Sequence, residues 1–547
     1  MMKEIFRKKI TIVIPLLISV IIFLYVCGPR CLNPTNIDWL FEGDSAQHYL
    51  GWAFFKNSPW SFPLGLNPDW GIENSSSIIY ADALPIFSLL FKCFYPFLPD
   101  TFQFYGIWFL TCFILQAFFS WRLLSFFKVN LFLKTFGTLI FTLSPIIFLR
   151  LGGHQSLTAH FLILWCFCLY YGHIAIRNSI EWIVCLSLSL ACHPYFSFMC
   201  LVIFGAYVVK EFLNERTIQT FWKLLVLCLL CFISIFFTAW QIGLFVSTAQ
   251  PSAVSGYGHF KFNLNGFLNP LGQSFFLKTL PHGAGDYEGF AYLGLGLILL
   301  LFVVLILDGS NGFKQTKKII NRSLPLCVSL FFLFLLAVSN NVSFGNWNIN
   351  LFSIKEGSFI QTFRAAGRFI WPIWYFLCLY AFVLMQQLIN ERIISFKFSA
   401  ILIIILSSIQ IMDFNDFIHD QIRHQLMTSN SNKWGAQSKD WIILRKKYNE
   451  IRLLNNPGLS YPKWRELSLI AVNNKMKTNV SYLARGDSNV LKERMKIDEL
   501  LLRDCNFNKN IIYVITDKNI IDLGKCLKEP QIIKKIDGFN LLLPNGF

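Results

Sequence analysis

The sequence predicts a polytopic α-helical membrane protein with about eleven transmembrane helices and a small C-terminal α/β domain. Of its 547 residues, 54% are hydrophobic and only 14% are charged, about half the charged fraction of a soluble protein. Its apolar runs recur, and many are long enough to cross a hydrocarbon core of about 30 Å. The chain also contains 58 Phe, and many of its aromatic residues lie near the ends of apolar runs, where Trp and Tyr mark the membrane interface.

The first apolar run follows a basic start and lacks a small-residue cleavage site, so we expect a retained signal anchor. With the N-terminus inside, nearly every strongly basic short loop lies on the inner side, as the positive-inside rule requires. A run at Ala83–Pro99 is too short to span and contains Lys92, which predicts an interfacial or re-entrant helix. The predicted spans are residues 10–27, 103–126, 134–150, 157–175, 180–193, 195–210, 222–245, 290–307, 324–339, 368–388 and 398–412.

This topology predicts a transmembrane domain at residues 1–413, with a long first outer loop at 28–102, and a C-terminal domain at 414–547 on the outer side. Two further long loops, 246–289 and 340–367, also face out. The C-terminal region is polar and alternates strand and helix patterns, which predicts a small α/β domain. Its predicted strands are Leu467–Val472, Asn479–Ala484, Ile511–Thr516 and Asn540–Leu543, and its predicted helices are Asn489–Arg503 and Asn519–Leu527.

Charge and cysteine content exclude some classes of protein. The net charge of +17 does not indicate nucleic-acid binding, because the basic residues are dispersed between apolar spans. Most of the 15 Cys lie in apolar runs and act as small hydrophobic residues, and Cys166 and Cys168 are too apolar in context to indicate a metal site. Cys505 and Cys526 lie in the polar C-terminal region. The sequence leaves open whether they form a disulfide or are two free thiols.

The first outer loop carries the richest set of candidate catalytic residues, in the string EGDSAQHYLGW from Glu42 to Trp52. Asp44 and His48 are four residues apart and share one face if the segment is helical. A partly desolvated carboxylate can take a proton from a hydroxyl group, so we predict that Asp44 is a base that His48 and Asp82 orient or tune. Glu42 is a secondary candidate that also fits a solvated loop acid.

The late string QTFRAAGRFIWP places Arg364 and Arg368 four residues apart at the start of an apolar helix. Arginine binds phosphate through a planar fork, and a helix N-terminus adds its own attraction for anions. Outer-side arginines oppose the positive-inside trend, which favours a phosphate site over interfacial snorkelling. Lys261 in the second long loop is a further candidate for binding phosphate.

Several histidines map to the outer ends of spans or to outer loops. Histidines with nearby carboxylates can bind a divalent metal, but no HxxxH or HxH spacing is present, so the metal stays unknown. Hydrogen-bonded interfacial histidines fit the same pattern. The secondary candidates are His154, His193 and His259.

No nucleotide-binding motif is present, so the energy for a synthetic reaction must come with the substrate. A sugar on a polyprenyl phosphate supplies it. Its phosphate leaves without a general acid, because the second phosphate pKa is about 6. One base on the acceptor and cations on the departing phosphate are then sufficient.

With these motifs the chain resembles the GT-C superfamily of integral-membrane glycosyltransferases, which have an acidic motif in the first outer loop. The strings GDSAQHYLGW, SPWSFPLGLNP, FRAAGRFIWP and VSYLARGD resemble more closely a large, mostly uncharacterised family of bacterial inner-membrane proteins. The resemblance implies a GT-C-like fold, a lipid-phosphate sugar donor and an active site that faces the periplasm. Asp44 matches the first-loop aspartate of the superfamily.

We therefore predict a GT-C-type glycosyltransferase of the bacterial inner membrane. It would move a sugar from a polyprenyl-phosphate donor to a surface glycan or a lipid-linked acceptor on the periplasmic face. The main alternative is a transporter or flippase for a lipid-linked saccharide, which needs charged residues within spans and repeated halves. A scaffold for envelope assembly with a degenerate site is a third reading.

Overall fold

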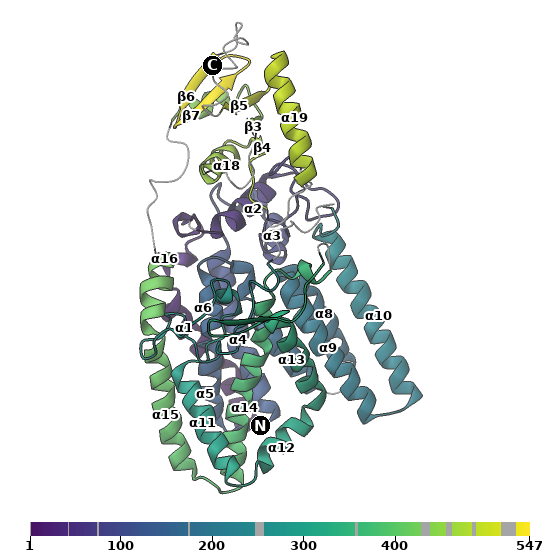
Figure 1. The fold of residues 1–547 in the computed structure, drawn as a ribbon, viewed down its shortest axis with the longest axis vertical. Coiled ribbons are helices and arrows are strands. Elements are labelled where there is room, and N and C mark those ends of the chain that lie inside the picture. The colour runs from purple at the N-terminus through teal and green to yellow at the C-terminus, as the bar shows by residue number, and fades with distance from the viewer. Residues whose placement is uncertain are drawn as a thin grey trace. The chain divides into compact units, whose positions relative to one another are not determined.

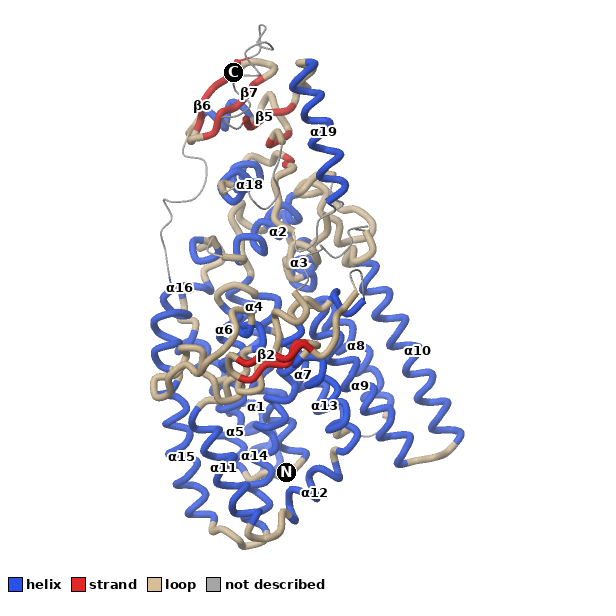
Figure 2. Tube along the Cα trace, in the orientation of Figure 1, coloured by secondary structure: helices blue, strands red, loops and turns tan. Residues whose placement is uncertain are grey.

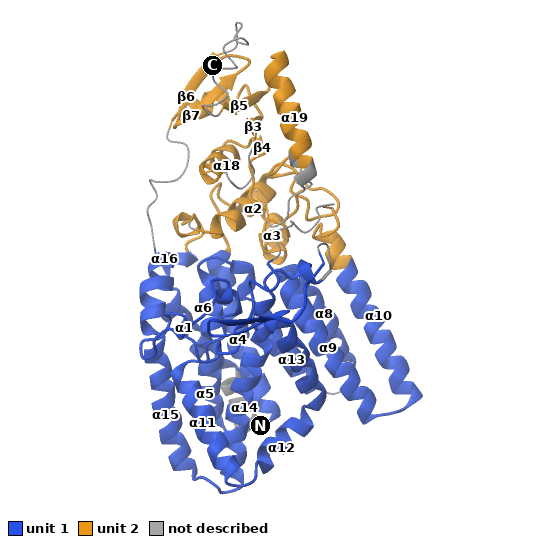
Figure 3. Cartoon of the chain, viewed as in Figure 1, with its two compact units in different colours: residues 1–32, 105–236, 253–427 blue, residues 33–104, 237–252, 428–547 orange. Residues whose placement is uncertain are grey.

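The computed structural model describes residues 2–41, 43–73, 76–172, 175–246, 256–355, 359–427, 438–455, 462–483, 488–515 and 532–547. The chain is mostly helical, at 61% (Figure 2). It divides into two compact units, each assembled from separate stretches of sequence (Figure 3). Unit 1 comprises residues 1–32, 105–236 and 253–427, and unit 2 comprises residues 33–104, 237–252 and 428–547.

Helices lie at all eleven predicted spans (Figure 1). Among the described residues, six helices are long and apolar enough to cross a membrane, or seven if the bent pair α11–α12 is one span, whereas the sequence predicts eleven. Shorter apolar helices account for three more of the predicted spans. The helices of unit 1 are α1 (Met2–Val26), α4 (Tyr105–Phe126), α5 (Leu131–Thr142), α6 (Pro145–Leu151), α7 (Phe161–Tyr170), α8 (Ile176–Cys192), α9 (Pro194–Asn214), α10 (Ile218–Gln241, which ends in unit 2), α11 (Leu295–Gly309), α12 (Lys314–Arg322), α13 (Leu324–Val338), α14 (Trp371–Asn390), α15 (Phe396–Asp413) and α16 (His424–Met427).

The bend between α11 and α12 has a local cause. The two axes differ by 111°, and Gly312 and Phe313 both take positive φ angles of 67° and 56° at the break. Asp308 then accepts hydrogen bonds from the backbone N–H groups of Gln315 (3.2 Å) and Thr316 (2.8 Å) in the first turn of α12. Because this carboxylate pairs backbone N–H donors that the first turn of a helix leaves without an intrahelical partner, the chain restarts there in another direction.

Short elements connect the long helices of unit 1. The strands β1 (Asn341–Phe344) and β2 (Trp347–Asn350) form an antiparallel hairpin that directly follows α13. Two 3-10 helices, η5 (Asp286–Gly289) and η7 (Ala366–Ile370), precede α11 and α14. A π-helix at Phe417–Arg423 precedes α16.

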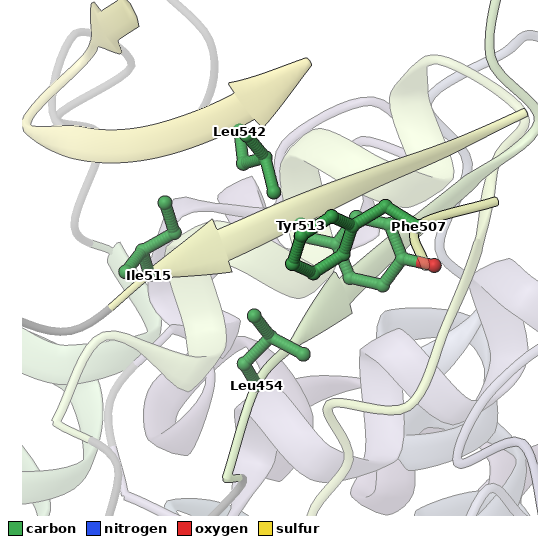
Figure 4. Packing of buried hydrophobic residues seen from close by; sticks show 5 residues of the cluster. All are labelled: Leu454, Phe507, Tyr513, Ile515 and Leu542. Atoms are coloured by element: carbon green, nitrogen blue, oxygen red, sulfur yellow. The ribbon is translucent and has the colours of Figure 1, made fainter. Parts of the chain in front are cut away.

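Unit 2 combines the first long loop with the C-terminal segment. Its mixed sheet has the order β4-β3-β5-β7-β6, in which β4, β3 and β5 are parallel and β7 is antiparallel to both β5 and β6. Tyr513 and Phe507 pack edge to face beside Leu454, Ile515 and Leu542 in a core of this unit (Figure 4). The strands are β3 (Glu450–Leu453), β4 (Lys477–Thr478), β5 (Ile511–Ile515), β6 (Ile532–Ile536) and β7 (Phe539–Leu543), and the helices are α2 (Ser45–Asn57), α3 (Pro85–Lys92), α17 (Asp440–Leu444), α18 (Trp464–Asn473) and α19 (Ser488–Asp504).

The two sequence segments of unit 2 are tied together at the sheet edge. The backbone of Thr478 in β4 donates to Asp69 O (3.0 Å) and accepts from Gly71 N–H (2.9 Å). Arg452 in β3 forms an ion pair of 2.7 Å with Glu73. The first loop therefore folds with the C-terminal sheet.

Several predictions for the polar segments can be compared with the structure. The strands at β5 and β7 and the helix at α19 are confirmed, whereas the predicted strand Leu467–Val472 is wrong and lies inside helix α18. All six residues of that run are buried. The run therefore lacks the alternation of buried and exposed positions that would distinguish a strand from a helix. The predicted strand Asn479–Ala484 is also wrong, because β4 ends at Thr478 and residues 479–483 form no strand. The predicted helix Asn519–Leu527 lies outside the described residues.

The run Ala83–Pro99 forms the short helix α3 and a 3-10 turn at Tyr95–Phe97, as its length predicts. The ammonium group of Lys92 lies 3.9 Å from the ring centroid of Phe55 and 4.8 Å from that of Trp60. These cation–π contacts stabilise a charge inside an apolar run.

Candidate functional sites

A buried ion cluster joins three elements of unit 1. Arg368 in η7 binds Glu288 in η5 through two parallel hydrogen bonds, from Nε and from Nη2, each 2.9 Å long. Arg150 in α6 contacts the same carboxylate at 3.0 Å through Nη1 and the Glu288 carbonyl oxygen at 3.3 Å through Nη2. All three side chains are less than 10% exposed. The cluster therefore fixes two guanidinium groups on one carboxylate in a desolvated place.

Two glycines allow this approach. A Cβ atom on Gly367 would lie 2.6 Å from the Cα atom of Gly289, and one on Gly289 would lie 2.4 Å from the carbonyl oxygen of Lys261. The Gly367 N–H also donates to Phe260 O at 2.9 Å. Because each of these neighbours is backbone, only glycine fits, and η5 and η7 come close enough for Glu288 to reach Arg368.

Burial alone would raise the pKa of Glu288, but Arg368 and Arg150 outweigh it and hold that pKa well below its usual range. Glu288 is thus a carboxylate at neutral pH. His154, a sequence candidate at the start of a 3-10 turn, is near enough to lower the same pKa further.

Arg364 and Arg368 have different surroundings. Arg364 is exposed, and its guanidinium lies 5.8 Å from the ring of Phe260, which packs against the ring of Tyr287. Arg368 is buried, paired with Glu288, and 4.9 Å from the ring of Tyr195. The two arginines therefore differ in their surroundings: Arg364 is exposed, whereas Glu288 holds Arg368 in place.

The arginine site, which consists of Arg150, Arg364, Arg368 and Glu288, is cationic. Three arginines and one glutamate leave a net charge of +2, and all three arginines lie within electrostatic reach of Tyr287. Lys261 is close to Asp286, of opposite charge, so this pair adds nothing to the total. The Lys261 ammonium donates to the Asn348 side chain on β2 (2.7 Å), and burial lowers its pKa.

The other histidine candidates have local contacts. His193 precedes α9, and its Nδ1 accepts a hydrogen bond from Tyr195 N–H (3.2 Å), so it caps that helix. His259 is exposed and packs against the ring of Phe260. Within the part of the chain that the structure describes, no three histidines and carboxylates come close enough together to share a metal ion.

The acidic loop of unit 2 (residues 41–48) contains the predicted base. Asp44 is half-buried and directly precedes α2, where its carbonyl oxygen accepts from Gln47 N–H (3.0 Å) and His48 N–H (3.4 Å). Every residue from Ser45 to Lys56 is buried, so α2 is a core helix of unit 2 and not a surface helix. Glu42 lies outside the described residues.

Asp82 lies beside this helix. The Gln47 side chain donates to Tyr80 O at 3.2 Å, and a Cβ on Gly51 would lie 2.5 Å from the Cβ of Ala81 and 3.2 Å from that of Ala83. Asp82, between these two alanines, is half-buried with a positive φ of 49°. Unit 2 therefore brings the segment of Asp82 against the helix that carries His48.

His48 is fully buried in this region, and burial lowers its pKa to about 3. It is therefore neutral at physiological pH. A neutral imidazole can tune a neighbouring acid but adds no positive charge to the site.

Arg465 on α18 is a residue that sequence reasoning missed. Its Nη2 donates to Gly43 O (3.1 Å) and its Nη1 to Phe41 O (3.4 Å), on either side of position 42. The Ser468 side chain, also on α18, accepts from the indole of Trp70, which stacks on Phe54 of α2. The C-terminal segment thus holds the backbone of the acidic loop.

The structure groups the candidates by unit. Asp44, His48 and Asp82 belong to unit 2, and the phosphate candidates Arg364, Arg368 and Lys261 belong to unit 1. That the two groups act on one ligand stays a prediction. Sequence reasoning also missed Arg150; a charge at the end of an apolar run, which requires a counter-ion, was the available signal.

These features define a helical protein that has, in the part of the chain that the structure describes, six or seven helices long and apolar enough to cross a membrane, and a second unit built around a small sheet. Residues 16–415 match a domain of unknown function (DUF6311), and residues 440–544 match the DUF6311 C-terminal domain. The chain belongs to the DUF6311 family. No curated protein matches it, and no solved structure does.

Proposed function

We propose that this protein is a GT-C-type membrane glycosyltransferase with eleven spans. It takes a sugar from a polyprenyl-phosphate donor and passes it to a surface glycan or lipid-linked acceptor on the periplasmic face of the bacterial inner membrane. The observation that carries the proposal is the cationic site of unit 1, where three arginines and one glutamate leave a charge of +2.

The arginine site suits a phosphate that departs with negative charge. Arg150 and Arg368 are immobilised by Glu288, so their field costs no reorganisation when the bond breaks. Arg364 is exposed and provides the direct contact to the phosphate oxygens. Among the described residues, none accepts a hydrogen bond from Nε of the buried Arg150, which leaves one further donor in the cluster.

Asp44 supplies the base. It takes the proton of an acceptor hydroxyl, the hydroxyl oxygen bonds to the anomeric carbon, and the bond from that carbon to the phosphate oxygen breaks. The phosphate leaves with the bonding electrons, and the configuration inverts. Asp44 is half-buried and thus both reachable and partly desolvated, which favours proton abstraction.

A disulfide in the C-terminal segment supports the prediction that this segment lies on the periplasmic side of the membrane. Cys505 is disulfide-bonded, and disulfides persist in oxidising compartments such as the periplasm. Cys526, for which the sequence leaves a disulfide with Cys505 open, lies outside the described residues.

The test is a transfer assay with reconstituted protein and a polyprenyl-phosphate sugar, read by mass spectrometry of donor and acceptor. Asp44→Asn should abolish transfer, whereas Glu499→Gln, which removes an exposed carboxylate of the same unit, should not. If wild-type protein moves the lipid between leaflets and its mass is unchanged, the protein is a flippase. Wild-type turnover in Asp44→Asn would overturn the assignment of the base.

A further inference from the structure

Three cysteine thiols meet in the interior of unit 1. Cys166 lies on α7, Cys185 on α8 and Cys200 on α9, and their Sγ atoms are all within 4.8 Å of one another. The Sγ atoms of Cys166 and Cys185 are 3.5 Å apart. Each of the three residues has 0% exposure. Three consecutive helices thus direct one thiol each to a common point, a cluster that the apolar sequence context of Cys166 did not indicate.

The separations fit three ligands around one ion. A metal–sulfur bond is about 2.3 Å long, so three sulfurs in a plane around a metal lie about 4 Å apart. The observed range, from 3.5 Å up to at most 4.8 Å, includes that value. Small shifts of side chains would therefore complete a trigonal site.

The ligand set selects the class of ion. Among the described residues, no histidine, carboxylate or fourth cysteine joins the group, whereas structural zinc sites have four ligands. Thiolates favour soft ions such as Cu(I).

We propose that Cys166, Cys185 and Cys200 form a trigonal site for a soft monovalent cation of the Cu(I) class, which joins α7, α8 and α9. On binding, each of the three thiols loses its proton to solvent, and each thiolate sulfur forms one bond to the ion. The site does not depend on glycosyl transfer, because none of its residues belongs to the arginine site or the acidic loop.

The test uses the full chain in detergent, with Cys93→Ser to remove an exposed thiol, under anaerobic conditions. Cu(I) is added in competition with bicinchoninic acid, and bound copper is counted per chain. We expect one tightly held ion, three sulfur neighbours at about 2.3 Å by X-ray absorption, and affinity weaker by more than about 100-fold in Cys185→Ser.

The matched control is Cys168→Ser. Cys168 lies two residues from Cys166 on the same helix and is equally buried, but it is not in the cluster. The Cys168→Ser protein should bind Cu(I) with the affinity of the parent protein. Circular dichroism verifies folding, and Cys200→Ala replaces Cys185→Ser if the latter does not fold. Equal affinity in the parent and the cluster variants, no copper uptake, or a site with fewer than three sulfurs would overturn the proposal.

Discussion

The arginine site of unit 1 and the acidic loop of unit 2 bury ionisable side chains in opposite ways. In unit 1, Glu288 is buried and charged, because Arg150 and Arg368 both bind it. In unit 2, His48 is buried and neutral, because burial lowers its pKa to about 3. The first arrangement provides a fixed charge across the physiological pH range. The second provides a group that resists protonation beside a half-buried acid.

The largest expected effect comes from breaking the fixed charge cluster. Glu288→Gln leaves two guanidinium groups buried without their carboxylate, and removing one partner of a buried ion pair costs about 3–5 kcal/mol. We expect a loss of this size in the unfolding free energy in detergent. Glu391→Gln is the control, because its pair with Lys318 is exposed (49% and 63%) and should change stability by less than about 1 kcal/mol. Equal effects of the two substitutions would contradict the role of the cluster.

The close backbone approach in unit 1 predicts the next effect. Gly367→Ala places a Cβ 2.6 Å from a backbone atom that cannot move aside, and overpacking costs about 1–3 kcal/mol. Gly51→Ala in unit 2 meets the Ala81 side chain at 2.5 Å and should cost a similar amount. Gly205→Ala, in α9 with nothing within 4 Å, should instead be neutral or slightly stabilising. Thermal unfolding of the three variants distinguishes these outcomes, and a stable Gly367→Ala protein would exclude the close approach.

The two regions differ in their response to acid. The unfolded chain protonates His48 below pH 6.5 while the folded chain does not until about pH 3, so stability falls as the pH falls through this range. From pH 6.5 to 5 the loss should be about 2 kcal/mol. The stability that the Glu288 ion pairs contribute depends on a lower pH range. It is complete above the ordinary carboxyl pKa of 4.5 and is lost only at lower pH. His48→Gln should flatten the slope between pH 6.5 and 5, and an unchanged slope would show that His48 is not the cause.

The smallest expected effect concerns Arg465. Its two hydrogen bonds to carbonyl groups of the acidic loop are 3.4 and 3.1 Å long and contribute about 0.5–1.5 kcal/mol in total, because α18 holds α2 by other contacts as well. In Arg465→Met, amide hydrogen exchange should accelerate at Gly43–His48 and stay unchanged in β5. Uniform acceleration across unit 2 would indicate a general loss of stability instead.

Much of the helical architecture could be predicted, because long apolar runs are a local property of the sequence. The count of eleven membrane-crossing helices stays a prediction, because several predicted spans contain apolar helices of only 10–17 residues, namely Ile12–Val26, Gln155–Tyr170 and Leu324–Val338. The strands β3 and β6 were missed because they are short and partly charged. The sheet they form depends on pairing between distant segments.

The candidate sites were predicted only in part. Arg364 and Arg368 form a symmetric pair in the sequence, but the structure exposes one and buries the other against Glu288. Glu288 and Arg150 lie 138 residues apart, and no local sequence pattern predicts their contact. Arg465 was missed for the same reason, because it reaches the acidic loop from the C-terminal segment.

The proposed reaction requires that Asp44 and Arg364 act on one substrate, and the side of the membrane on which each residue lies tests this most directly. In intact inner-membrane vesicles of known orientation, with the Cys93→Ser background, Asp44→Cys and Arg364→Cys are labelled separately with a membrane-impermeant maleimide. We predict that both react from the periplasmic side. Labelling from opposite sides would leave the proposed base and the phosphate site without a shared substrate and would contradict the glycosyltransferase.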